Sequence, residues 1–226
     1  MTRLGFDQYT TALDEGRHLR VVNYHNTPHA TADHLRAELT AYAAAFTSVT
    51  LEDLDRYFTT GAWHLDRPGF IPVFYEGYLN NATVAAPICD DLGITAWFPV
   101  ITAFIDCPVA EQRAFADAHD IDLVEEERSL ERIAMTWDQV AELSERHVIT
   151  PHTATHEQVA KIVTPEDFER EIVAPRAAVE RATGREAPAF VALYGTPHGG
   201  SPDHDRAIRD AGYRYHISNT AIQRIG

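Results

Sequence analysis

The feature that most constrains the fold of this 226-residue chain is the alternation of short apolar runs with longer segments of helical periodicity. The run over residues 94–98 is almost wholly apolar, as expected of a parallel strand that is buried on both faces. Such alternation predicts a parallel sheet with helices outside it. About six strand–helix units predict an α/β barrel or near-barrel, in one domain spanning residues 1–226. The predicted strands are residues 19–24, 70–74, 94–98, 148–150, 189–193 and 213–218.

Capping residues and periodicity place helices between these strands. Thr136 and Gln139 form a capping box that opens one helix. Thr164, followed by proline and two acidic residues, starts another helix that we expect to reach Gly184. Pro87 should limit or kink a helix over residues 82–92. The other predicted helices are residues 35–46, a segment from residue 50, 109–118 and 203–211.

The charge and composition exclude several classes of partner. A formal net charge of −15 disfavours nucleic acid and anionic membrane surfaces, which both select clustered Lys and Arg. No stretch approaches the length of a transmembrane helix, and the polar N-terminal segment lacks the apolar region of a signal peptide. We therefore expect a soluble, cytoplasmic chain. Neither Cys89 nor Cys107 has a CxxC partner, which excludes a zinc ribbon or a redox motif.

Chemically active side chains are expected just past the carboxyl ends of the strands. One such segment contains His152 and His156, four residues apart, which on a helical turn would project from one face and share a metal. With twelve histidines in the chain, roughly one such pair is expected by chance. His25 and His29 form a second pair after a strand, so spacing alone does not choose between them.

Two further strand ends supply candidates. Glu76 follows the predicted strand 70–74 and is the best carboxylate to complete a two-histidine metal site; the alternative is a surface glutamate in a turn. The run 194–200 is rich in glycine, which lets backbone approach a ligand closely. His198 in this run is a candidate proton donor, because the ordinary histidine pKa lies near neutrality. A plain surface loop is the alternative.

In their order along the chain, these segments resemble the polysaccharide deacetylase family, also called the NodB-homology domain or carbohydrate esterase family four. The match at His152-Thr153-Ala154-Thr155-His156 to the family's H-[ST]-x-x-H motif is the most specific. The other similar segments are the opening "YH" strand at 22–26, the short helix at 50–54, the "TFDDGY" strand at 70–81, the "atfFv" strand at 94–105, the "ltWdqlreL" helix at 135–143, "YPyG" at 192–195, "aikeaGY" at 207–213 and "lpRi" at 222–225.

The resemblance implies a distorted (β/α) barrel of the NodB-homology type and a divalent metal, with zinc the expected ion. It further implies hydrolysis of an N-acetyl group on a glycan, an amino sugar or a small amide. His152 and His156 align with the two histidine ligands, and Glu76 takes the place of the ligand aspartate. The resemblance also implies that His25, Tyr194 and Gly195 bind substrate. The proline of "YPyG" is absent, because Gly195 follows Tyr194 directly.

The chain departs from the family at Tyr75, which occupies the position of the aspartate that serves as general base. A tyrosine, with an ordinary pKa near 10, does not accept a proton from water at neutral pH. Tyr75 is instead expected to donate a hydrogen bond to an oxyanion, with His198 or His25 protonating the leaving amine. Glu76 could act as the base rather than as a ligand. Two hypotheses follow: a metal-dependent amide hydrolase, or a non-hydrolytic domain that keeps the fold and binds a ligand. The sequence does not indicate the oligomeric state.

Overall fold

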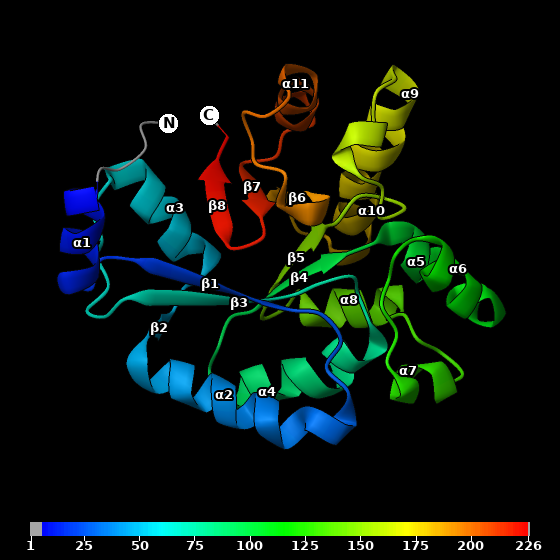
Figure 1. Ribbon diagram of the computed structural model, residues 1–226, viewed down its shortest axis with the longest axis horizontal. Helices are drawn as coiled ribbons and strands as arrows, with labels where there is room; N and C mark the ends of the chain where they lie inside the picture. The colour runs from blue at the N-terminus through cyan, green and yellow to red at the C-terminus, as the bar shows by residue number, and fades with distance from the viewer. Residues whose placement is uncertain (1–5, 226) are drawn as a thin grey trace.

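The computed structural model describes residues 6–225, whose strands form two sheets near the centre of the molecule (Figure 1). The larger sheet has the order β1-β3-β4-β5, and β2 pairs in parallel with the start of β3. The smaller sheet has the order β6-β7-β8, in which only the last pair is antiparallel. The strands are β1 Leu19–Tyr24, β2 Thr47–Ser48, β3 Gly69–Phe74, β4 Trp97–Val100, β5 Val148–Pro151, β6 Ala189–Val191, β7 Tyr215–Ser218 and β8 Ala221–Arg224.

The two sheets meet between β5 and β6, where side chains rather than a ladder join the strands. The Thr150 hydroxyl of β5 donates to the Ala189 carbonyl of β6. Just past the end of β5, His152 Nδ1 bonds the carbonyl of Val191, the last residue of β6, at 2.9 Å. This junction makes the barrel distorted, as expected. Its interior is an apolar cluster contributed by both sheets: Val21, Ile71, Val73, Trp97, Val148, Ala189, Val191, Tyr215 and Ile217.

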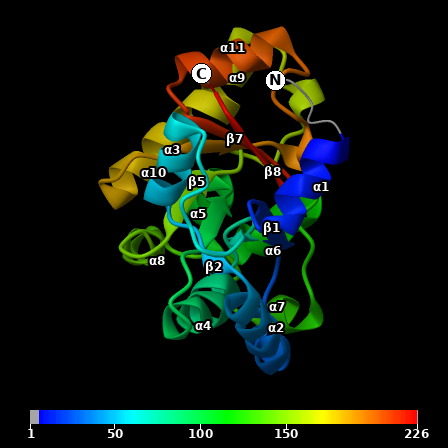
Figure 2. The same ribbon diagram turned by 90° about the vertical axis from the view of Figure 1, so that its left-hand side faces the viewer.

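Helices cover the outside of this strand layer (Figures 1 and 2). Leu35 and Leu39 of α2 share a core cluster with Phe70 and Phe74, outward-facing side chains of β3. The helices α9, α10 and α11 gather around β6 and β7. The α-helices are α1 Phe6–Asp14, α2 Ala32–Ala45, α3 Leu51–Thr60, α4 Ala86–Asp91, α5 Thr102–Asp106, α6 Gln112–Ala118, α7 Glu125–Ser129, α8 Trp137–Leu143, α9 Pro165–Phe168, α10 Ala174–Thr183 and α11 Pro202–Asp210.

Short 3₁₀ and π turns explain where the predicted helices are divided. The predicted helix from Thr164 to Gly184 contains a π turn, η5 Glu169–Val173, which ends two residues before Pro175, a residue with no N–H to donate into a regular helix. Another π turn, η2 Asn81–Ala85, precedes Pro87 in the same way. The remaining short turns, of 3₁₀ type, are η1 His29–Thr31, η3 Val109–Glu111, η4 Val159–Lys161 and η6 Leu193–Gly195.

Several elements differ from the expectations. The third strand begins and ends later than predicted, at Trp97 and Val100, and Leu193 belongs to a helical turn rather than to β6. The elements α1, α5, α7, β2 and β8 were not predicted. They are short or lie where no strong periodicity marks them, so their structure depends on contacts from elsewhere in the chain. None of the described helices is long and apolar enough to cross a membrane.

Candidate metal centre

The segments that follow β1, β3, β5 and β6 surround a cavity of about 230 Å³ at the carboxyl ends of these parallel strands. This is where the fold places chemically active groups. The lining residues come from six separate parts of the chain: Asn23, His25, Tyr75, Glu76, Asp120, Asp122, His152, His156, Ala192, Leu193, Tyr194 and Asn219.

The two predicted histidine ligands reach this cavity from a loop, not from a helical turn as the spacing suggested. His152 follows β5 directly, and the chain then turns back because Thr153 and His156 both have a positive φ, of 59° and 60°. This conformation is uncommon for residues other than glycine and points to a constrained segment. It brings the two imidazole rings to 5.0 Å between centroids.

Backbone carbonyls fix the orientation of both rings. His152 Nδ1 lies 2.9 Å from the Val191 carbonyl, and His156 Nδ1 lies 2.7 Å from the His119 carbonyl. A carbonyl only accepts, so each Nδ1 carries the proton and each Nε2 keeps a lone pair. Burial lowers the pKa of His152 to about 3 and also lowers that of His156, which keeps both rings neutral. A neutral imidazole oriented by a carbonyl is the form that binds metals.

A buried carboxylate holds the loop between the two histidines. Glu171 is fully buried and accepts from the N–H groups of Ala154 and Thr155 at 3.0 and 2.9 Å, and from the Thr155 hydroxyl at 2.9 Å. The Ala154 carbonyl in turn accepts from the Ala103 N–H at 2.9 Å. These bonds leave the loop little freedom, so the positions of both ligands are set by their surroundings.

Glu76 enters the cavity through a strained turn after β3. Its φ is 72°, and the next residue, Gly77, has a φ of 83°. This φ favours glycine, and a Cβ at Gly77 would in addition make a tight contact, 3.1 Å, with the Ile105 side chain. Asn81 donates at 2.9 Å to the Tyr75 carbonyl and thereby ties down the peptide that precedes Glu76.

The residues present fit a metal ion. Ligand atoms of Glu76, His152 and His156 all lie within 4.8 Å of one another, and all three residues are buried. Within residues 6–225, neither Glu76 Oε2 nor His156 Nε2 has a hydrogen-bond partner. Burial raises the pKa of Glu76 to about 8, so this carboxylate needs a nearby cation to stay ionised at neutral pH. One carboxylate and two neutral imidazoles form a known ligand set for zinc.

Tyr75 and His25 lie beside these three residues. The Tyr75 hydroxyl donates to the Asn219 carbonyl at 3.2 Å, and its ring stacks on His25 and meets His152 edge-on. Burial raises the pKa of Tyr75, so the hydroxyl keeps its proton and remains a donor. His25 Nε2 lies 3.5 Å from Glu76 Oε1.

The structure does not bring all of the predicted site residues together. Tyr194 lines the cavity with its side chain 59% exposed, whereas Gly195 does not line it and packs against the Asn219 side chain. His198 lies elsewhere: its ring packs against His216 on the outer face of β7, and its Nε2 lies 3.7 Å from Asp205 Oδ1. A proton-donor role for His198 at this cavity therefore lacks the required proximity.

Four lining residues were not anticipated: Asn23, Asp120, Asp122 and Asn219. Asn23 lies in β1 two residues before His25, so its position near a strand end was a usable signal. The two aspartates flank the buried Ile121 in a loop after α6, and Asn219 occupies the β7–β8 turn with a φ of 49°. No strand ends at Asp120 or Asp122, so the rule that selected the other candidates does not reach them, whereas Asn219 directly follows the end of β7 and was overlooked.

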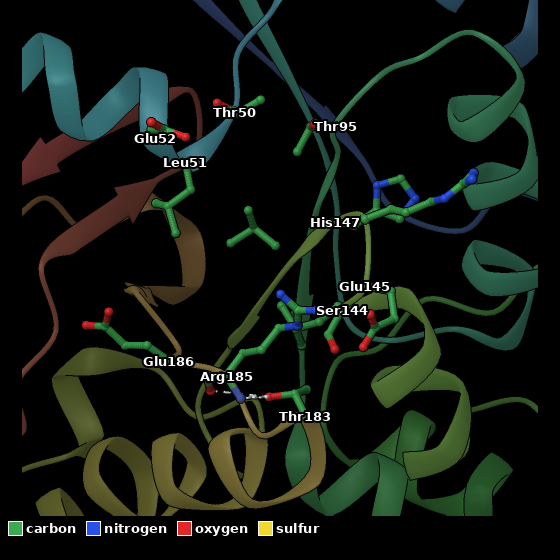
Figure 3. Close-up of a pocket in the computed structure, with 13 residues that line it drawn as sticks. Thr50, Leu51, Glu52, Thr95, Ser144, Glu145, His147, Thr183, Arg185 and Glu186 are labelled. Atoms are coloured by element: carbon green, nitrogen blue, oxygen red, sulfur yellow. Dashed lines mark hydrogen bonds and ion pairs between the residues drawn. The ribbon is translucent and has the colours of Figure 1, made fainter.

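A larger cavity, of about 560 Å³, lies at the opposite, amino ends of the strands (Figure 3). Its lining includes Thr95 before β4, Val148 at the start of β5 and Glu186 before β6. Arg185 on its rim pairs with Glu145 at 3.0 Å. This cavity contains no cluster of metal ligands within the described part of the chain, so volume alone is a poor guide to the chemistry here.

Comparison with known proteins defines the family. A family model described as "Polysaccharide deacetylase" matches residues 73–216, well over half of the chain, and this segment contains Glu76, His152 and His156. The chain belongs to the polysaccharide deacetylase family. A search of curated proteins found no match.

Solved structures share the fold of this polysaccharide deacetylase family member. A de-N-acetylase from Aggregatibacter actinomycetemcomitans aligns with a TM-score of 0.67 and 16% identity, covering 92% of this chain and 91% of that one. The Streptococcus pyogenes deacetylase PplD gives 0.66 and 14%, with coverage of 86% and 80%. IcaB from Ammonifex degensii gives 0.63 and 18%, with coverage of 90% and 87%. At these identities the likeness establishes the common α/β barrel fold.

Proposed function

We propose that this protein is a metal-dependent amide hydrolase that removes an N-acetyl group from an amino sugar or from a small acetylated amine. The observation that carries the proposal is the convergence of Glu76, His152 and His156, buried, within 4.8 Å of one another, at the carboxyl ends of the strands. Membership of the polysaccharide deacetylase family supports amide hydrolysis as the reaction. Zinc is the expected ion because the ligands are two imidazoles and one carboxylate.

The three ligand residues hold their geometry without help from a substrate. A divalent ion bound there supplies Lewis-acid polarisation of an amide carbonyl and a nucleophile at neutral pH. The carbonyls of Val191 and His119 keep the lone pairs of both histidines directed at the cavity. Tyr75, which stays protonated, would donate its hydroxyl hydrogen to the carbonyl oxygen of the substrate as negative charge develops there.

His25 is the group that we propose to move protons. Its Nε2 lies on the cavity side, 3.5 Å from Glu76 Oε1, and its ring is held flat against Tyr75. Burial lowers the pKa of His25, so its ring is neutral at neutral pH and can accept a proton from the attacking water and return it to the leaving amine. His25 would then do the work that an aspartate at position 75 does in the family pattern.

The proposal is tested by measuring bound zinc and acetate release for the wild type and for His152→Ala. We expect about one zinc per chain and hydrolysis in the wild type, with loss of both in the variant, because His152 supplies one of three protein ligands. The control is exposed His34 on α2. His34→Ala should retain both the bound zinc and the hydrolysis of the wild type. A wild type that binds no metal and releases no acetate from any acetylated amine would overturn the proposal.

A wild type that binds metal without hydrolysing any amide would favour the non-hydrolytic alternative. That alternative is supported by Tyr75, which occupies the position of the family's general base. Tyr75→Asp separates the two cases. If only this variant releases acetate, the native chain has the metal site of a deacetylase but lacks its base.

A further inference from the structure

The metal-site cavity continues into a second hollow on the other side of Tyr194. This hollow has a volume of about 260 Å³ and shares Asp120, His156, Leu193 and Tyr194 with the metal-site cavity. The Tyr194 hydroxyl donates to the Asp120 carboxylate, and Tyr194 itself has a positive φ of 55°. The Tyr194–Asp120 pair therefore stands between the two hollows, and a substrate longer than one acetylated group would pass it.

Acidic groups dominate both hollows. No Lys or Arg lines the metal-site cavity in the described part of the chain, whereas Glu76, Asp120 and Asp122 all do. Among the described residues that line the second hollow, Lys161 is the one Lys or Arg, and it pairs with Glu157 at 3.0 Å. Because Lys161 is already paired with Glu157, it is not free to bind a carboxylate group of a substrate.

Asp120 and Asp122 are exposed at the mouth of the metal-site cavity, and no ion pair to either is found within residues 6–225. Asp117, also in the second hollow, differs because Arg128 pairs with it at 3.0 Å. Besides these carboxylates, one buried acceptor of the same cavity indicates a ligand with hydrogen-bond donors. Asn23 Oδ1 is buried without a donor among the described residues, and Asn23 is not one of the three metal-cluster residues.

We propose that the substrate is an N-acetylated amine that carries a second, protonated amino group, which Asp120 and Asp122 hold next to the metal centre. A bound divalent ion would balance the negative charge of Glu76. Asp120 and Asp122 are not among the three ligand residues, so the ion would not balance their negative charges in the same way. They select a cationic neighbour of the scissile amide and disfavour acidic substrates. This inference rests on the proposed function, since it names the substrate class of the same site.

The test compares matched pairs of amides on the zinc-loaded protein. One pair is di-N-acetylchitobiose and the same disaccharide with a single acetyl group; the other is N-pentylacetamide and N-acetylputrescine, which differ by a terminal amine. We expect kcat/KM to be about tenfold higher for the cationic member of at least one pair, and that pair shows whether the substrate is a sugar or a diamine. The preference should fall in 1 M salt, because exposed charges are screened.

The variants Asp120→Asn and Asp122→Asn should each reduce the preference by up to about fivefold, the range of one exposed ion pair. The change should appear mainly in KM for the cationic substrate, and it should be larger for that substrate than for its neutral partner. Asp203→Asn, which removes an exposed charge on α11, is the control.

Three outcomes would overturn the inference while leaving the proposed function intact. These are equal rates on both members of each pair, faster hydrolysis of the neutral members, or a drop in kcat for charged and neutral substrates alike in Asp122→Asn, which would make this residue a base. Failure of the zinc-loaded wild type to hydrolyse any of the four amides would instead count against the proposed function.

Discussion

At the scale of single residues, Tyr75 decides how the candidate site can work. A carboxylate at this position could accept a proton, whereas a buried phenol with a raised pKa can only donate one. Its hydroxyl already lies at the cavity wall, where it donates to the Asn219 carbonyl at 3.2 Å. Tyr75 can exchange this one hydrogen bond to an exposed turn for a hydrogen bond to substrate at a small cost in free energy.

The variant Tyr75→Phe tests this donor role. It removes the hydroxyl and keeps the ring that stacks on His25. We expect kcat to fall by about 10²-fold or more, the usual effect of removing one oxyanion donor, with zinc content unchanged. Steady-state kinetics and metal analysis check both parts. An unchanged kcat would show that the hydroxyl only anchors the β7–β8 turn.

At the scale of elements, the long helical segment from α9 to α10 acts on the metal centre through its π turn. Glu171 lies in η5 Glu169–Val173 and is buried, and its carboxylate accepts two N–H groups of the loop between the histidines. The ion pair between Glu171 and half-exposed Arg170 neutralises part of its charge. A side chain from a distant helix thus fixes a loop that has little regular structure of its own.

The variant Glu171→Gln should weaken zinc binding by about tenfold, because a glutamine that keeps its carbonyl oxygen on the two N–H groups turns its NH2 group toward the Arg170 Nε–H, which is also a donor, and loses the charge that pairs with Arg170. Metal affinity is measured by competition with a chromophoric chelator. Glu169→Gln in the same turn, where the side chain is exposed, is the control and should bind zinc like the wild type. Equal affinities for both variants would show that the loop holds its shape unaided.

At the scale of the whole molecule, buried histidines make stability depend on pH. His147, His152, His156 and His216 are all buried, and burial lowers the pKa of each. An unfolded chain binds protons on these rings below about pH 6.5, whereas the folded chain binds them only at lower pH. The free energy of unfolding should therefore decrease as the pH falls from about 6.5.

His216 offers a test of this pH dependence away from the metal ligands. Burial lowers its pKa to about 4, so it contributes stability that is present above pH 6.5 and lost as the pH falls towards 4, up to about 3 kcal/mol. His216→Phe keeps a ring against Phe190 but cannot titrate. Between pH 6.5 and 4, its free energy of unfolding should therefore decrease by up to about 3 kcal/mol less than that of the wild type. Urea unfolding with a chelator present measures it, and His34→Phe is the control. Parallel pH profiles for wild type and His216→Phe would contradict the assignment.

The sequence itself determined the order of elements and the choice of His152 and His156 as candidate metal ligands. Apolar runs and capping boxes such as Thr136 with Gln139 are local patterns that predict an α/β barrel or near-barrel, and the structure and the family confirm this fold. The two histidines were selected by their place after a predicted strand together with the match to the H-[ST]-x-x-H motif. Local patterns report which residues are buried, so they identify strands and helices and the ends of strands. This is also why Glu76 could be selected as a partner for the histidines.

Only the tertiary structure decided which loops meet. It brought Asp120, Asp122 and Asn219 to the metal-site cavity and placed His198 on the far side of β7, although His198 and Tyr194 are only four residues apart. It also supplied the carbonyls and the Glu171 carboxylate that orient the histidines. These contacts join residues 16 to 144 positions apart. Chain closure over such distances is set by packing of the whole barrel, and no short sequence window contains that information.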